Sequence, residues 1–330
     1  MNFTRSMPAN PLDLLRLKEN GFVNANSLKI SKTDISRLRY LSRSQYDLQK
    51  KNHLNANQIS DSKCSASYPI FLNRLPEYHA EIVQILNQFF ENSLTQSFLE
   101  PIVGNNYKIW QIAYRRSEPG DRGLYLHQDA IGETNICILL SDNHSVNGAT
   151  AFVPYSHHLP RLLQKLKLNT PAQLVTYLSP LFLQPLNGFA GDIGLFFNKT
   201  WHARHRNSSN QIYDVILISL FPEGCTFGPI QEDDVWSPKF LEGIAGTFLE
   251  SRLNLKINTL SGSGNMLYVQ KPQHVESPLS MELEQKMLVS LKPLNIKILC
   301  LIFILLATSM TRFIANVPKS IRAYASSFFR

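Results

Sequence analysis

Cysteines are few in this chain of 330 residues, and none of them are paired in sequence. Cys64, Cys137, Cys225 and Cys300 lie far apart and form no C-x-x-C motif. A zinc ribbon and a disulfide framework both need closely spaced cysteines, so the sequence indicates neither. We expect reduced thiols, with Cys137 as an inert thiol of the core.

The N-terminus lacks the apolar stretch of a secretory signal peptide. Residues 1–5 lead directly to Pro8 and Pro11 without a hydrophobic segment. A signal peptide carries an apolar region of about 7–15 residues before its cleavage site. We therefore expect a cytoplasmic protein.

Acidic residues are absent after Glu284, where seven Lys and Arg follow. Residues 1–51 hold ten basic and four acidic residues, and residues 52–284 hold 16 basic and 21 acidic ones. The net charge of +8 therefore belongs to the two ends, while the body of the chain is mildly acidic. Nucleic-acid binding usually requires a basic surface. Because the body of the chain is mildly acidic, we expect no nucleic-acid partner.

The tail at 293–330 contains an apolar run that is short for a membrane span. The run 298–310 has 13 residues between Lys297 and Arg312, whereas a membrane-spanning helix needs about 20. Two interpretations stay open: a buried core helix, or membrane contact, either as a span over 294–317 with snorkelling basic ends or as an in-plane anchor. The flanking basic residues favour contact with a membrane surface.

The middle of the chain is rich in short runs of β-branched and aromatic residues. Gly, Pro, Asn and Ser separate these runs, which predicts a mainly antiparallel β region with strands at 109–114, 124–126, 134–140, 149–153, 193–197 and 213–221. Apolar residues at helical spacing predict helices at 76–94 and 159–178, a polar helix at 33–50, and a short helix that ends at Gly21.

These patterns divide the chain into four parts. We expect an N-terminal helical lead with a polar linker at 1–60, a β core at 61–235, a helical or irregular extension at 236–292, and the basic apolar tail at 293–330. The fold class is mainly β with flanking helices.

The residues that carry chemistry are an H-x-D pair and a distant histidine. His127 and Asp129 are two apart on a strand-like run, so both side chains point to the same side while Gln128 faces away. Two histidines and one carboxylate form the facial triad that holds Fe(II) and leaves coordination positions open. His202 would then arrive from a neighbouring strand.

Around these residues the sequence resembles the phytanoyl-CoA dioxygenase family of Fe(II)/2-oxoglutarate oxygenases. The resemblance covers about 12–222 and has four places in the family's order: a helix with E-N-G-F-V at 15–23, H-Q-D at 127–129, an N-G turn with a strand and a P-x-S-H sequence at 147–157, and the distal histidine segment at 191–207.

This resemblance implies a double-stranded β-helix, a jelly-roll barrel of two facing sheets. It implies that His127, Asp129 and His202 are the metal ligands and the catalytic centre, with Fe(II), 2-oxoglutarate and dioxygen as cofactors. The family's chemistry couples decarboxylation of 2-oxoglutarate to succinate with hydroxylation of a substrate. Asp129 favours hydroxylation over halogenation, because a small residue there would open a halide position.

The chain departs from the family at two places. The family has Gly where this chain has Tyr155, which predicts a changed turn near the barrel mouth. The family's Arg for the distal carboxylate of 2-oxoglutarate is expected nine to eleven residues after the distal histidine. This chain has Gln211, Ile212 and Tyr213 there, and a phenol cannot supply the charge of a guanidinium.

Arg204 is our leading candidate for the missing cation, because it lies two residues after His202 and on the same side of a strand. Arg206, Arg115 and Arg116 are alternatives, and a solvated loop charge is an equal interpretation of Arg204 and Arg206. We assign Arg204, Tyr213 and Gln111 to the co-substrate contacts.

The sequence therefore predicts a dioxygenase that hydroxylates a small molecule, lipid-like if the tail touches a membrane. The absent Arg keeps an alternative open: a membrane-tethered barrel that binds a ligand and has lost turnover of 2-oxoglutarate. A zinc hydrolase that uses the same ligands is a third interpretation, which the H-Q-D context favours less.

Overall fold

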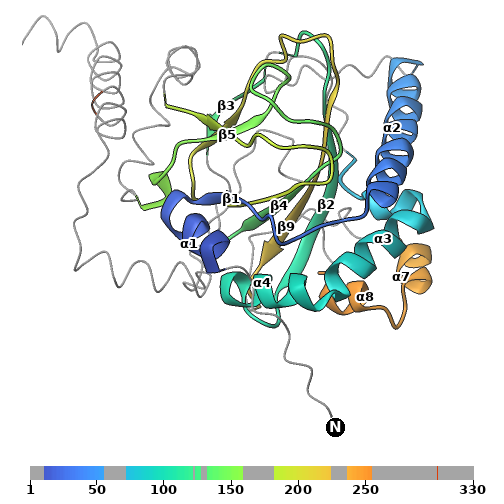
Figure 1. The fold of residues 1–330 in the computed structure, drawn as a ribbon. Coiled ribbons are helices and arrows are strands. Elements are labelled where there is room, and N and C mark those ends of the chain that lie inside the picture. Colours follow the sequence, from blue (N-terminus) through green and yellow to red (C-terminus); the bar gives the residue numbers. More distant parts are fainter. Residues whose placement is uncertain are drawn as a thin grey trace, which may run out of the picture.

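Two antiparallel sheets face each other in the structure of this protein (Figure 1). The structure is a computed structural model, and it describes residues 11–55, 72–121, 123–127, 132–158, 182–223, 236–254 and Phe303. The larger sheet has the order β1 (Phe22–Asn24), β7 (Ile193–Phe197), β4 (Thr134–Leu139), β9 (Tyr213–Phe221) and β2 (Lys108–Ser117). The smaller sheet has the order β3 (Leu124–His127), β8 (His202–Arg204), β5 (Thr150–Phe152) and β6 (Gln184–Pro185).

Helices cover the outer side of the larger sheet. In Figure 1, α1 lies beside β1, and the other helices gather near β2 and β9. The helices are α1 (Pro11–Asn20), α2 (Lys32–Asn55), α3 (Ala80–Glu91), α4 (Ser93–Val103), α7 (Pro238–Gly243) and α8 (Phe248–Arg252), with 3₁₀ turns at η1 (Leu75–Tyr78) and η2 (Ser156–His158).

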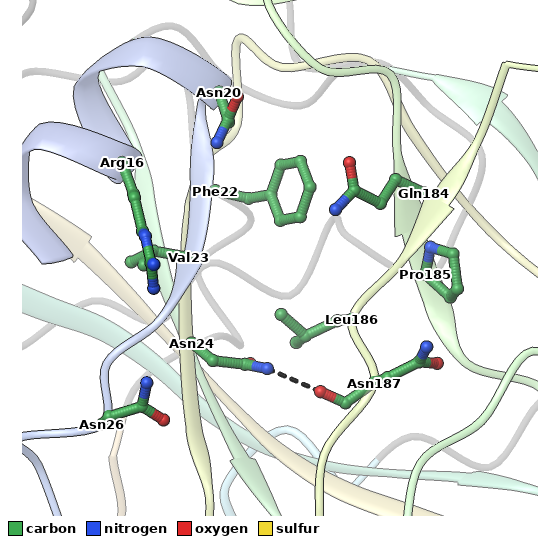
Figure 2. A pocket seen from close by; sticks show the side chains of 10 residues that line it. All are labelled: Arg16, Asn20, Phe22, Val23, Asn24, Asn26, Gln184, Pro185, Leu186 and Asn187. Atoms are coloured by element: carbon green, nitrogen blue, oxygen red, sulfur yellow. Dashed lines mark hydrogen bonds between the residues drawn. The ribbon is translucent and has the colours of Figure 1, made fainter.

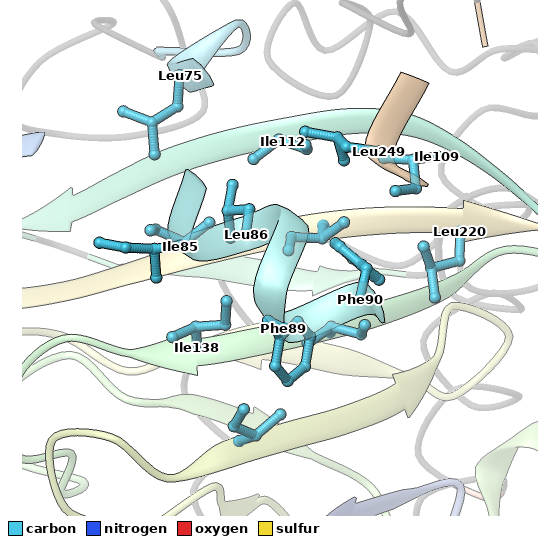
Figure 3. Close-up of a cluster of buried hydrophobic side chains, with 14 of the residues drawn as sticks. Leu75, Ile85, Leu86, Phe89, Phe90, Ile109, Ile112, Ile138, Leu220 and Leu249 are labelled. Atoms are coloured by element: carbon cyan, nitrogen blue, oxygen red, sulfur yellow. The ribbon is translucent and has the colours of Figure 1, made fainter. Parts of the chain in front are cut away.

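Strand alternation divides the buried side chains into two clusters, one on each face of the larger sheet. On β9, Ile216, Ile218 and Leu220 face the helices, while Tyr213 and Val215 face the interior between the sheets. Figure 3 shows the helix side, where Ile85, Leu86, Phe89 and Phe90 of α3 lie over the sheet. Period-two alternation thus gives this sheet a packed outer face and a separate inner face.

One hydrophobic core cluster joins residues from both ends of the range 11–254. Val23 of β1 and Leu17 of α1 join the same cluster as Trp236 and Leu249, which lie near the other end of the described residues. The core therefore crosses the boundaries that the sequence suggested at residues 60 and 235.

The predicted helix at 76–94 is in fact interrupted. α3 ends at Glu91, Asn92 has an extended backbone, and its side chain accepts a hydrogen bond from the Leu94 amide at 2.9 Å as the N-cap of α4. An Asn cap satisfies one of the free amides at a helix start, which favours a new helix there. The apolar spacing at 76–94 predicts one helix and does not indicate α4. The helix predicted at 159–178 lies outside the described residues.

Tyr155 lies in the turn that the sequence predicted to differ from the family's. Its φ is 66°, the left-handed conformation that glycine adopts without strain. Glycine would adopt this backbone conformation without the crowding that the Cβ of Tyr155 brings.

Candidate functional site

The two predicted histidine ligands meet on the smaller sheet. His127 of β3 and His202 of β8 are cross-strand partners, and their ring centroids lie 4.2 Å apart. His202 is 5% exposed, so its ring lies inside the barrel. Residues that are far apart in sequence are thus brought to one point by strand pairing.

A hydrogen bond sets the orientation of the His202 ring. Its Nδ1 donates to the backbone carbonyl of Thr200 at 2.8 Å, which leaves the lone pair on Nε2, the nitrogen that a metal would bind. Thr200 is itself held, because its hydroxyl donates to the carbonyl of Gly21 at 3.0 Å. The histidine pair therefore fits the two-histidine part of an iron site.

The carboxylate ligand of the prediction, Asp129, lies outside the described residues. Within the described part of the chain, no group of three or more His, Cys, Asp or Glu side chains is arranged to hold a metal ion. The structure thus places two of the three predicted ligands, and Asp129 follows His127 by two residues in the sequence.

Aromatic rings surround His202 on the interior side. The ring centroids of Phe196 and Phe152 lie 5.0 Å and 6.1 Å from that of His202. Phe22 stacks on Phe152 at 4.5 Å, so the aromatic packing continues to β1. An apolar wall of this kind excludes water from a reactive centre.

Arg204 lies in the same strand as His202, two residues later, and is opposite Thr150 of β5. Its guanidinium Nη2 donates to Asp121 Oδ2 at 2.5 Å. The side chains of Arg204 and Asp121 are 17% and 3% exposed, so this ion pair is largely buried. Arg204 is therefore not a solvated loop charge, the second interpretation that the sequence left open.

Tyr213 stands where the sequence analysis expected the family's Arg. It is fully buried at the start of β9, and burial, followed by the neighbouring Cys137 thiol, raises the pKa of its phenol far above the usual range. The Arg204 guanidinium lies near enough to act in the opposite direction on that pKa. The phenol is therefore neutral, and Arg204 is a cation close to the position of the missing one.

Gln111 belongs to a polar row across the inner face of the larger sheet. It is 3% exposed and is the register partner of Ser219, which in turn faces Asn135. The Ser219 hydroxyl donates to Asn135 Oδ1 at 2.9 Å, and the Asn135 amide donates to Asn198. The row ends next to Phe196, which lies beside His202, because Asn135 and Phe196 are also register partners.

Sequence reasoning missed Asn135, Asn198 and Ser219. All three are buried polar residues within or beside strands, at 5%, 0% and 4% exposure. A polar residue at an inward position of a predicted strand is the signal that could have marked them.

A separate cavity of about 410 Å³ opens between the free edges of the two sheets, at β1 and β6 (Figure 2). Figure 2 shows Asn24 donating to the Asn187 carbonyl, at 2.5 Å, across this gap. Phe22 and Leu186 line it and also belong to the inner cluster. The other lining residues are mostly amides: Arg16, Asn20, Val23, Asn24, Asn26, Gln184, Pro185 and Asn187.

The sequence profile of phytanoyl-CoA dioxygenase matches residues 92–213. Residues 92–213 are therefore similar to this family. The match includes His127, Asp129 and His202 and ends at Tyr213, so it confirms the resemblance on the segment that holds the predicted ligands. The family's enzymes are dioxygenases, which confirms the predicted class of oxidoreductase. A comparison with curated proteins finds no match to the chain.

Several solved structures are similar to this chain at low sequence identity. AviO1 from Streptomyces viridochromogenes Tue57 is 18% identical over 68% of this chain and all of AviO1, with a TM-score of 0.50. EvdMO1 is 19% identical over 64% of this chain, with a TM-score of 0.46, and the match spans 50% of EvdMO1. HygX from Streptomyces hygroscopicus, solved with nickel and 2-oxoglutarate bound, is 14% identical over 70% of this chain and 93% of HygX, with a TM-score of 0.48.

The predicted fold class is confirmed. Two facing antiparallel sheets with outer helices form a double-stranded β-helix, and the likeness to AviO1 supports this fold. Among the helices that the structure describes, none combines the length and apolar character needed to cross a membrane. The tail at 293–330 lies outside the described residues, apart from Phe303.

Proposed function

We propose that this protein is an Fe(II)- and 2-oxoglutarate-dependent dioxygenase that hydroxylates a small molecule. The observation that carries the proposal is the cross-strand pair of His127 and His202, with the His202 ring held by the Thr200 carbonyl. The phytanoyl-CoA dioxygenase match over residues 92–213 supports it. Decarboxylation of 2-oxoglutarate to succinate accompanies hydroxylation in this chemistry.

His127, Asp129 and His202 would hold the iron, which when bound supplies the oxidation of the substrate by dioxygen. The residues of the chain orient and shield this centre. Thr200 fixes the imidazole plane of His202, and Phe152 and Phe196 keep water away from one side. Arg204 supplies the positive charge that a 2-oxoglutarate carboxylate needs, with Tyr213 and Gln111 as neutral polar neighbours.

The substrate is inferred from the cavity between β1 and β6, which reaches the histidine site through Phe22, because Phe22 lines the cavity and stacks on Phe152 beside His202. Its five amide side chains and Arg16 present both donors and acceptors, which suits a polar small molecule. A lipid-like or membrane-bound substrate is the other candidate, which the apolar run at 298–310 suggested. Vesicle flotation of the full chain tests it: sedimentation without the vesicles would rule out membrane association through the tail.

Anaerobic titration with Fe(II) tests the activity class. The protein is titrated with and without 2-oxoglutarate, while the weak visible charge-transfer band of the chelate is followed. We expect a band that needs both additions and that His202→Ala abolishes. His144→Ala removes an exposed histidine instead and is the matched control, for which the band should persist.

A second candidate function is a barrel that binds a ligand without turnover. The observation in its favour is the pairing of Arg204 with Asp121, which neutralises the charge that the co-substrate would use. Iron binding without a 2-oxoglutarate-dependent band would favour this second function. Zinc binding with no response to Fe(II) would instead favour the hydrolase interpretation.

A further inference from the structure

We propose that Asp121 is a positioning residue which aims the guanidinium of Arg204 at the distal carboxylate of 2-oxoglutarate. The proposal rests on the proposed function, since it concerns the co-substrate of that site. The positive charge that the chain lacks at Tyr213 would come from Arg204 of the smaller sheet, and Asp121 would orient it. Asp121 lies between β2 and β3, and Arg204 lies in β8.

The hydrogen bonds of Arg204 use only one edge of its guanidinium. Nη2 donates to Asp121 Oδ2 at 2.5 Å, and Nη1 lies 3.5 Å from the carbonyl of Arg116. Nε is buried and has no hydrogen-bond partner among the residues that the structure describes. Nε and the second hydrogen of Nη2 form the other edge, and such an edge grips a carboxylate with two parallel hydrogen bonds.

The free edge of the Arg204 guanidinium can bind the co-substrate only if it faces the interior of the barrel. Arg204 shares its strand face with His202, is opposite Thr150, and influences the buried phenol of Tyr213. A 2-oxo acid bound at the His127 and His202 end would extend its distal carboxylate toward these residues. The cation therefore reaches from the strand of the metal ligand rather than from β9.

Asp121 is itself held in place by its loop. Its Oδ1 accepts from the Gly123 amide at 2.9 Å, and its backbone carbonyl accepts from the Asn207 amide at 2.9 Å. The Asn207 side chain donates to the Ser117 carbonyl at 3.1 Å, which ties the same loop to the end of β2. Gly123 has no room for a side chain, because a Cβ there would lie 2.3 Å from the Arg204 carbonyl.

A buried carboxylate held on both oxygens is a fixed support. Removing one member of a buried ion pair leaves the other charge without compensation, so the guanidinium would turn toward a different acceptor. We expect Asp121 to matter for co-substrates with a distal carboxylate and not for iron itself.

The test measures binding of two co-substrates to the full chain loaded with Fe(II) under anaerobic conditions. The probes are 2-oxoglutarate and 2-oxopentanoate, which has the same chain length but no distal carboxylate. We expect wild type to prefer 2-oxoglutarate by at least about tenfold, in line with a charge-assisted pair of hydrogen bonds. Asp121→Asn should lose most of this preference, with its Fe(II) affinity unchanged.

Asp121→Asn could lose binding because it folds poorly, so two further variants test the same role. Asp121→Glu retains the charge and should show an intermediate preference. The double variant Arg204→Ser, Tyr213→Arg moves the cation to β9 and should restore the preference, after which Asp121→Asn should change it less than twofold. Asp47→Asn, an exposed partner of Arg116, is the control and should leave the preference unchanged.

The outcomes separate the two proposals. If wild type forms no complex with Fe(II) and 2-oxoglutarate, the proposed function fails. If wild type forms it and both Asp121 variants keep the full preference for 2-oxoglutarate, the positioning role of Asp121 is overturned while the function stands. The single variant Arg204→Ser is measured beside them: if it loses the preference while both Asp121 variants keep it, Arg204 alone is the anchor and the positioning role is likewise overturned.

Discussion

Tyr155 carries a backbone conformation that its side chain disfavours. Among the residues that the structure describes, it is the one non-glycine residue with a positive φ, at 66°. A residue with a Cβ loses roughly 1–2 kcal/mol of stability in the left-handed conformation, because the Cβ crowds the following carbonyl. The turn after β5 therefore stores strain, and the Tyr155 ring is 39% exposed and adds little packing in return.

Tyr155→Gly should stabilise the protein by about 1 kcal/mol, since glycine adopts this conformation without strain. Denaturant unfolding followed by circular dichroism measures the change. Tyr155→Ala is the control, because it removes the ring and keeps the Cβ. Equal stability of the two variants would show that the backbone there is not strained.

His157 makes stability depend on pH. Burial, followed by the neighbouring His158 and Lys199, holds the pKa of His157 well below its usual range, although its Nε2 donates to the Lys18 carbonyl at 3.0 Å. The unfolded chain takes up a proton near pH 6.5 while the folded chain does not, so the unfolded state binds more protons below that pH. Stability should therefore fall as pH drops below about 6.5.

His157→Gln should flatten this pH dependence, because glutamine can donate the same hydrogen bond but does not titrate. The measurement is the free energy of unfolding at pH 7.5, 6.5 and 5.5, where wild type should lose up to about 1.4 kcal/mol per pH unit. A smaller slope will remain, since burial also lowers the pKa of His205. An unchanged slope in His157→Gln would assign the dependence to other groups.

At the scale of elements, α2 is fastened to the larger sheet through one buried carboxylate. Asp214 of β9 is fully buried, accepts from Arg43 Nε at 2.5 Å, and accepts from the Tyr114 hydroxyl at 2.5 Å. On the surface of the same helix, Arg37 pairs with Glu81, and both side chains are about half exposed. A buried pair that loses one partner is destabilised far more than an exposed pair.

Asp214→Asn should therefore cost about 3 kcal/mol of stability, since Arg43 and the Tyr114 hydroxyl lose their charged acceptor. Thermal and denaturant unfolding check the value. Glu81→Gln breaks the exposed pair between α2 and α3 and should cause a much smaller loss. Similar losses in the two variants would contradict the anchoring role of Asp214.

Which elements the sequence could predict depended on where their stability comes from. β9 has nine consecutive residues that alternate between two buried environments, so its composition alone gave the bounds 213–221. β6 has only two residues, and β8 has three, so their pairing partners decide them rather than their own propensity. α4 depends on the Asn92 cap, which local hydrophobic spacing does not show.

The part of the candidate site that could be predicted is the part in which metal binding requires a fixed spacing of residues. H-x-D placed His127 on one face of a strand, and the resemblance supplied His202, which the strand register then placed opposite it. The role of Asp121 could not be read in advance, because an isolated Asp in a loop carries no pattern. Only the folded pairing with Arg204 reveals it.

At the scale of the whole molecule, residues 236–254 complete the core on the helix side. Trp236, Phe240, Ile244, Leu249 and Leu253 are all at most 8% exposed. Their burial stabilises the fold by roughly 8–15 kcal/mol in total, at about 1.5–3 kcal/mol for each side chain. This is as large as the whole stability of a typical domain.

A chain that ends at residue 235 should therefore fail to fold, while a chain that ends at residue 254 keeps these five side chains. Soluble expression and the thermal unfolding midpoint compare the two truncations directly. Comparing them isolates the contribution of 236–254, because both lack everything that follows. A folded product from the shorter chain would show that the core closes without this segment.

The pairing of β1 with β7 also sets the order of events during synthesis. Val23 and Leu195 are register partners separated by about 170 residues, so β1 leaves the ribosome long before its partner exists. At about 5–20 residues per second, this interval lasts on the order of 10–30 s. During it, Phe22 and Val23 have no sheet to join, and such a strand is a target for chaperones or for mispairing. The nascent chain of this protein is thus expected to depend on chaperones until β7 emerges.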